Sequence, residues 1–135
     1  MNKTELTKVA KKYHKSGLSC SEAMLRTFLP LLGEKDEYFR IATPFCAGIG
    51  RKRDLCGILT GGVMVIGFKY GRKEATDVCA KEKSSALAAE YYDWFQKNYK
   101  CTCKEILPDE FKGSTEKCTK ILEASVEYLH NKLFM

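Results

Sequence analysis

The chain has 135 residues, a formal net charge of +6 and a sequence pI near 8.9. This length fits a single domain over residues 1–135, which buries on the order of two-thirds of its unfolded surface without crosslinks. The basic runs at residues 8–15, 51–53 and 69–73 favour anionic partners, but no aromatic-interleaved basic motif accompanies them. We therefore expect no nucleic-acid binding.

Cysteine is the residue type that stands out. Seven are present: Cys20, Cys46, Cys56, Cys79, Cys101, Cys103 and Cys118. The first residues predict a polar helix rather than an apolar signal region, so we expect a reducing, cytoplasmic location. An odd cysteine count without a secretion signal argues against a disulfide scaffold and favours metal, cluster or thiol chemistry.

Three helices are predicted before residue 45. Asn2 to Glu5 reads as a capping box, followed by one apolar face of Leu6, Val9, Ala10 and Tyr13, and Gly17 ends this helix. Ser19 and Glu22 form a second capping box, which places Cys20 in the first turn of a helix that Pro30 and Gly33 kink or end. A short helix follows over about residues 35–43 with Phe39 and Ala42 facing inward, closed by Pro44.

The central predicted helix follows a glycine-punctuated basic loop over residues 45–53. Asp54 is expected to cap it and to place Cys56 in its first turn, and it runs to about Tyr70. Residues 55–68 carry no charge and are too few for a comfortable membrane span, which indicates a buried core helix. Gly57 and Gly61 share one face, and each costs about 1 kcal/mol relative to alanine, so we expect a neighbouring backbone to pack closely there.

Three further helices complete the prediction. One runs over about residues 74–98, with Cys79 in its middle and an apolar side of Val78, Leu87, Tyr91, Trp94 and Phe95. Thr102 and Glu105 have capping-box spacing, so Cys103 begins a short helix that Pro108 ends. The last starts at Gly113 and Ser114 and carries one face of Cys118, Ile121, Leu122, Ser125, Leu129 and Leu133. With no strand-like alternation, we expect an all-α, single-domain bundle of five to six helices around a buried, glycine-rich central helix.

Four cysteines share a position at or near a predicted helix N-terminus: Cys20, Cys56, Cys103 and Cys118. Unpaired backbone N–H groups and the helix dipole favour an anion there, so we expect lowered thiol pKa values and thiolates suited to redox chemistry or metal ligation. Cys79 is expected to be a small buried hydrophobic residue, whereas Cys46, in a loop, is equally consistent with packing and function.

Other metal and catalytic motifs are weak or absent in this sequence. None of these four cysteines forms the C-x-x-C knuckle usual in zinc ribbons, which disfavours structural zinc, and the Cys101-Thr102-Cys103 pair alone is ambiguous. His14 and His130 occur without an H-E-x-x-H motif, and His14 is expected to be a surface or capping residue. There is no P-loop, dinucleotide fingerprint or serine elbow.

A series of motifs spans nearly the whole chain in a specific order. It comprises Cys20-Ser-Glu-Ala-Met-Leu, Phe45-x-x-Gly48-Ile49-Gly50-Arg51, Cys56-Gly-Ile-Leu-Thr-Gly61, Tyr70-Gly-Arg72, Cys103-Lys-Glu-Ile-Leu and Lys117-Cys118. In this order and spacing the sequence resembles the C-GCAxxG-C-C family of putative redox-active proteins.

The resemblance implies a small helical protein with four characteristic cysteines, which correspond to Cys20, Cys56, Cys103 and Cys118. A similar domain is associated with the iron–sulfur part of split-Soret cytochromes, which implies a 2Fe–2S cluster held by these thiolates. The chain departs from the family pattern at Ile58, usually alanine, and at Cys46, usually glycine. Cys46 and Cys101 are therefore candidate substitute ligands or resolving thiols.

Two classes of function follow. The first is redox: a 2Fe–2S cluster for electron transfer, with Gly57 and Gly61 allowing close packing around it, or thiol–disulfide exchange between Cys20 and Cys56 or between Cys103 and Cys118. In the cluster form, the basic loop over residues 51–53 would tune the reduction potential or dock an acidic redox partner. The second is a non-catalytic helical binding or structural module, with zinc as its less favoured metal. Whether the protein is an enzyme, and its oligomeric state, stay open at this point.

Overall fold

The computed structural model of the chain describes residues 1–108 and 116–135. Within these residues the secondary structure is helical, with six α-helices, one 3-10 helix and no strand, which confirms the predicted all-α bundle. In chain order the elements are α1 (Lys3–Lys15), α2 (Cys20–Leu32), η1 (Asp36–Phe45), α3 (Gly57–Tyr70), α4 (Val78–Tyr99), α5 (Cys103–Ile106) and α6 (Glu116–Phe134).

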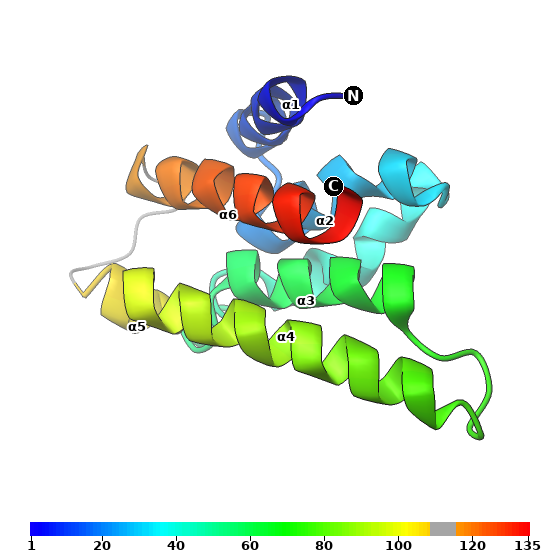
Figure 1. The fold of residues 1–135 in the computed structure, drawn as a ribbon. Helices are drawn as coiled ribbons and strands as arrows, with labels where there is room; N and C mark the ends of the chain where they lie inside the picture. Colours follow the sequence, from blue (N-terminus) through cyan, green and yellow to red (C-terminus); the bar gives the residue numbers. More distant parts are fainter. Residues whose placement is uncertain (109–115) are drawn as a thin grey trace.

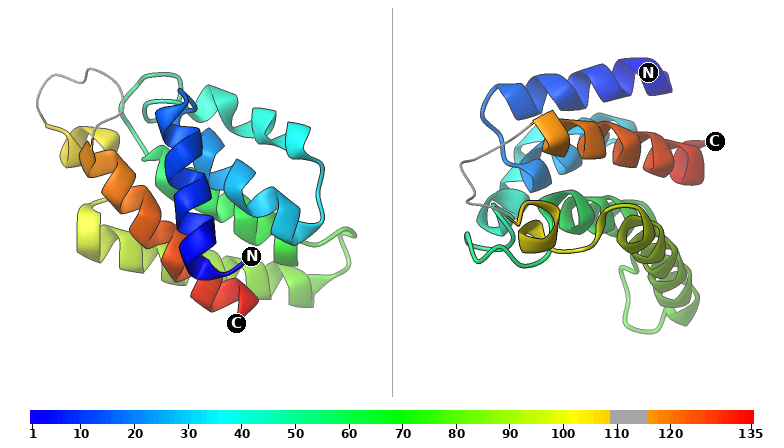
Figure 2. Two further views of the ribbon diagram at one scale, coloured as in Figure 1. Left: turned by 90° about the horizontal axis from the view of Figure 1, so that it is seen from above. Right: turned by 90° about the vertical axis from the view of Figure 1, so that its left-hand side faces the viewer.

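The helices stack in layers, with α2 and α3 in the middle. In Figure 1, α1 lies at the top, α2 and α6 form the next layer, α3 lies below them and α4 closes the bottom, and Figure 2 shows the same stack from above and from the side. Helix α2 contacts α1, η1, α3 and α6, while α3 also contacts α4. The starts of α3, α5 and α6 lie at the same side of the bundle, the left of Figure 1.

The predicted apolar faces form the core. Leu6 and Ala10 of α1 are fully buried, and every residue of the face predicted for α6 is buried. The expected caps are also present: Asn2 accepts from the Glu5 N–H at 2.8 Å, and Thr102 accepts from the Glu105 N–H at 3.1 Å. These starts are predictable because each cap is a contact between residues three positions apart.

The third predicted helix is a 3-10 helix rather than an α-helix, and it ends later than predicted. Residues 36–45 form a 3-10 helix that continues through Pro44 to Phe45 instead of closing at Thr43. A proline this close to the end removes one hydrogen bond, and the tighter 3-10 turn accommodates that loss. Ala42 is buried and Phe39 is half-buried, as predicted.

The predicted starts of two longer helices were wrong by a few residues. Asp77, whose carboxylate accepts from the Ala80 N–H at 3.0 Å, starts α4 at Val78 instead of near Glu74, which leaves Val78 59% exposed. Helix α3 starts at Gly57 with Cys56 as its N-cap, because the Leu55–Thr102 bridge keeps the preceding residues extended. The predicted start of the last helix at residues 113–114 lies outside the described residues.

The central helix is buried against its neighbours but not on every side. Val63 is 39% exposed and Gly67 is exposed, so the expectation of a fully buried helix holds only for the faces that pack against other helices, chiefly α2, α4 and α6. In the part of the chain that the structure describes, no helix combines the length and the apolar character needed to cross a membrane.

Candidate functional site

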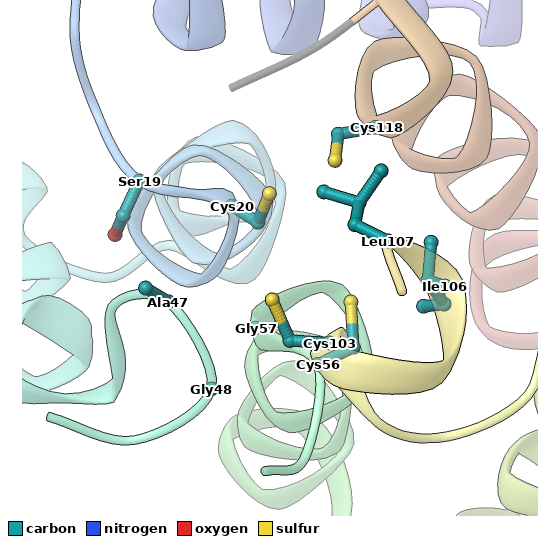
Figure 3. Close-up of a pocket in the computed structure, with 10 residues that line it drawn as sticks. All are labelled: Ser19, Cys20, Ala47, Gly48, Cys56, Gly57, Cys103, Ile106, Leu107 and Cys118. Atoms are coloured by element: carbon teal, nitrogen blue, oxygen red, sulfur yellow. The ribbon is translucent and has the colours of Figure 1, made fainter. Parts of the chain in front are cut away.

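Four cysteines from four separate helix starts line one small cavity. Cys20 is the first residue of α2, Cys56 immediately precedes α3, Cys103 is the first residue of α5, and Cys118 is the third residue of α6. Figure 3 shows their sulfur atoms directed into the same space. The cavity has a volume of about 60 Å³, and its other described lining residues are Ser19, Ala47, Gly48, Gly57, Ile106 and Leu107, none of which carries a carboxylate.

Backbone hydrogen bonds hold Cys56 beside Cys103. The Cys56 N–H donates to the Cys101 carbonyl at 2.8 Å, and the Cys103 N–H donates to the Asp54 carbonyl at 2.8 Å. These bonds flank the Leu55–Thr102 bridge, so the segments that precede α3 and α5 run side by side. Two cysteines that are 47 residues apart in sequence thereby become neighbours.

Gly57 and Gly61 mark the closest approach of α3 to α2. A Cβ atom added at Gly57 would lie 2.7 Å from the Ser21 backbone nitrogen, and one at Gly61 would lie 2.8 Å from the Ser21 carbonyl oxygen. Only a residue without a side chain fits against that backbone. A Cβ at Gly57 would also lie 3.3 Å from the Cys20 Cβ, so the same close packing brings Cys20 next to Cys56.

A left-handed loop covers another side of the cavity. Residues 47–51 all have positive φ angles, including the non-glycine residues Ala47 (47°), Ile49 (67°) and Arg51 (65°). Such a conformation costs roughly 1–2 kcal/mol for each non-glycine residue, so the surrounding contacts must maintain it. One is the Arg53 N–H bond to the Ala47 carbonyl at 2.9 Å.

Arg53 connects this loop to α5. Its guanidinium group donates a hydrogen bond to the Leu107 carbonyl, and its charge acts to lower the pKa of the neighbouring Cys103 thiol. Arg51 and Lys52, by contrast, are exposed on the adjacent surface. The loop therefore contributes one cation to the site itself and two to the surface beside it.

His14 also belongs to the site, which corrects its predicted assignment as a surface or capping residue. It is 3% exposed, its Nε2 lies 3.4 Å from the Cys20 sulfur, and its Nδ1 lies 3.0 Å from the Thr119 hydroxyl. Burial lowers the pKa of His14. The sequence does contain a signal for this position, because residue 14 follows Ala10 by four and so continues the buried face of α1.

The predicted lowering of the thiol pKa values was wrong in its net direction. Burial raises the pKa of Cys56 to about 12, although the N–H groups of Ile58 and Leu59 act in the opposite sense. A hydrogen bond with the Cys118 thiol, followed by burial, raises the pKa of Cys20. Burial also raises the pKa of Cys103, against the lowering effect of Arg53. Without a bound cation, these three cysteines are therefore neutral thiols near pH 7.

The other three cysteines lie outside the cavity. Cys101 is buried, and Cys46 is half-buried at the end of η1. Cys79 is exposed as the second residue of α4, contrary to the prediction of a buried mid-helix position. The early start predicted for α4 caused that error, because it placed Cys79 well inside the helix.

The arrangement suits some metal centres better than others. Among the described residues, no three His, Cys, Asp or Glu side chains lie close enough to hold a single metal ion. A 2Fe–2S cluster requires a Cys₄ donor set with two thiolates on each iron. The cavity offers four cysteine sulfurs without carboxylate competitors, so its donor chemistry fits that group.

Comparison with known proteins gives one match. The model of the family described as "Putative redox-active protein (C_GCAxxG_C_C)" matches residues 18–132. No curated protein and no solved structure matches the chain.

Proposed function

Because the chain belongs to the family described as "Putative redox-active protein (C_GCAxxG_C_C)", we propose that its four-cysteine cavity binds a 2Fe–2S cluster and transfers electrons. The observation that carries this proposal is the convergence of four sulfurs, from four helix starts, on one cavity (Figure 3). Cys20, Cys56, Cys103 and Cys118 would be the ligands. When bound, the cluster supplies a one-electron acceptor.

The electrostatics of the cavity favour the binding of a cationic metal centre. Two like charges 4 Å apart repel by about 4 kcal/mol at an effective dielectric constant of 20, so four neighbouring thiolates cannot ionise together without a counter-charge. A bound cluster would supply that charge, and the four cysteines would hold it as thiolates after losing their protons. Arg53 and the N–H groups of Ile58 and Leu59 then stabilise the negative charge on Cys103 and Cys56.

The surface beside the cavity suits an acidic electron-transfer partner. Arg51 and Lys52 are exposed in the loop whose residues Ala47 and Gly48 line the cavity. Complementary charge accelerates encounter more than it increases affinity. Replacing both residues by glutamine should therefore slow the association rate at low salt and leave the cluster intact.

Metal and sulfide analysis of protein prepared anaerobically tests the proposal. We expect a brown protein with about two irons and about two acid-labile sulfides per chain. Colourless, iron-free protein would contradict it, and a stoichiometric amount of zinc without sulfide would instead favour a structural module. Air-exposed samples are unsuitable because oxidation destroys exposed clusters and modifies thiols.

Thiol–disulfide exchange is a second candidate, supported by the four sulfurs that share the cavity (Figure 3). Cys20–Cys118 is the pair to test first, ahead of Cys20–Cys56 or Cys103–Cys118, because the Cys118 thiol has the largest effect in raising the pKa of Cys20. Oxidation would join the two sulfurs and pass two electrons and two protons to a disulfide substrate, which leaves as two thiols. Mass mapping after equilibration with oxidised and reduced glutathione tests it: a Cys20–Cys118 disulfide in iron-free protein supports exchange, and free thiols throughout contradict it.

A further inference from the structure

His14 contacts one cavity cysteine, Cys20, from α1, although that helix supplies no cysteine. Its ring is buried between the starts of α2 and α6, with Nε2 3.4 Å from the Cys20 sulfur and Nδ1 3.0 Å from the Thr119 hydroxyl. Thr119 directly follows Cys118, so the chain from Thr119 through His14 to Cys20 links the helices that carry two of the four proposed ligands.

The direction of these hydrogen bonds follows from the chemistry of a ligating cysteine. A metal-bound thiolate has no proton and can only accept, so the ring nitrogen facing Cys20 must carry the hydrogen. In the neutral ring, Nδ1 then holds a lone pair, and the Thr119 hydroxyl is the donor to it. The bond to sulfur is an N–H···S bond in either protonation state of the ring, because Nε2 carries a hydrogen in both.

We propose that His14 is a positioning residue that orients Cys20 and raises the reduction potential of the site by donating an N–H···S hydrogen bond to the Cys20 sulfur. This inference rests on the proposed 2Fe–2S function. Reduction adds one negative charge, part of which resides on the thiolate sulfurs. A donor aimed at one of these sulfurs therefore stabilises the reduced state more than the oxidised one.

Thr119 is the orienting group for the ring. Its hydroxyl fixes which nitrogen carries the hydrogen, as hydrogen-bond partners of histidine do around metal centres. Removing the hydroxyl leaves the ring in place but frees its tautomer and rotation. We expect this change to make the reduction potential more negative, as loss of His14 does, but by a smaller amount.

The test compares the reduction potentials of anaerobically prepared variants that have equal iron content. His14→Leu keeps apolar volume but removes the donor, His14→Gln keeps a side-chain N–H, and His130→Leu changes the other histidine, which stacks on Phe134. We expect His14→Leu to have a more negative potential than the wild type, His14→Gln to lie between them, and His130→Leu to match the wild type.

A spectroscopic measurement separates the hydrogen bond from a purely structural role. In the reduced protein labelled with ¹⁵N-histidine, pulsed electron paramagnetic resonance should detect one weakly coupled nitrogen, which His14→Gln removes and His130→Leu retains. Absence of that coupling in the loaded wild type would overturn the inference.

The remaining outcomes distinguish this inference from the proposed function. Equal potentials in loaded wild type and loaded His14→Leu overturn the inference and leave the proposed function intact. If His14→Leu fails to fold or to load, Thr119→Val decides: a smaller negative shift supports the inference, and an unchanged potential overturns it. An iron-free wild type overturns both.

Discussion

The cysteines inside the cavity and those outside it differ in what surrounds them more than in where they stand along a helix. Cys79 is at a helix start just as Cys20 is, yet it is exposed, whereas Cys20 meets a second thiol and a buried histidine. Cys101 and Cys103 are two residues apart, and only Cys103 lines the cavity. A helix start provides N–H groups, but convergence with other sulfurs is what distinguishes the candidate ligands.

Loss of one cavity cysteine should remove the bound iron, which is the largest effect that we predict. Replacing Cys56 by serine removes a soft thiolate ligand, and we expect it to abolish the bound cluster and its visible absorption. The matched control is Cys79→Ser, which should keep about two irons per chain. Iron analysis of both anaerobic preparations is the measurement, and equal iron content in the two would remove the distinction between the two groups of cysteines.

Alkylation rates should separate the groups by orders of magnitude in metal-free, reduced protein. Raising the pKa of Cys56 from 9.0 to about 12 reduces its thiolate fraction near pH 8 by about a thousandfold, and burial slows it further. Iodoacetamide labelling followed by peptide mass mapping should therefore modify Cys79 first and Cys56 much later. In urea the two should react alike, and similar rates in the native protein would contradict the burial argument.

One methyl group added where α3 packs against α2, the contact that brings Cys20 next to Cys56, should lower the stability of the protein. Gly61→Ala places a Cβ 2.8 Å from the Ser21 carbonyl oxygen, and we expect it to lower the free energy of unfolding by about 1–3 kcal/mol. Gly67→Ala, on the same helix, meets no atom within 4 Å and should be neutral or stabilising by up to about 1 kcal/mol. Denaturant unfolding of the metal-free proteins gives both values, and equal losses would show that the close approach is unimportant.

The buried thiols should also make metal-free protein less stable in alkali. Above pH about 9 the unfolded chain releases the Cys56 proton, but the native state retains it up to about 12. The native state then binds more protons, so the free energy of unfolding falls as pH rises, by about 1.4 kcal/mol per pH unit for each such thiol. Urea unfolding between pH 8 and pH 10 should show a steeper fall for wild type than for Cys56→Ala; parallel slopes would contradict this linkage.

Most of the fold was predictable because it depends on local signals. The caps at Asn2, Ser19 and Thr102 bind residues three positions away, and the apolar spacing in α6 identifies its buried face. The start of α4 was missed because Asp77, rather than a residue near Glu74, supplies the cap.

The site was only partly predictable, for a different reason. Four candidate cysteines could be named from helix starts, but their common cavity depends on the Leu55–Thr102 bridge and on the contact of Gly57 with α2, both of which are tertiary. The direction of the pKa shifts was missed because burial outweighs the effect of the N–H groups. The burial of His14 was missed, although its spacing from Ala10 places it on the buried face of α1, because a histidine at a helix end is expected to lie on the polar surface.

The most direct test of the central claim is the iron and sulfide content of a variant in which only the four cavity cysteines remain. This variant combines Cys46→Ser, Cys79→Ser and Cys101→Ala, and it is prepared anaerobically beside the wild type. We predict about two irons and two sulfides per chain in both proteins, with the same absorption spectrum. Iron-free protein, or iron lost in the triple variant while its fold is retained, would contradict the assignment of the cluster to Cys20, Cys56, Cys103 and Cys118.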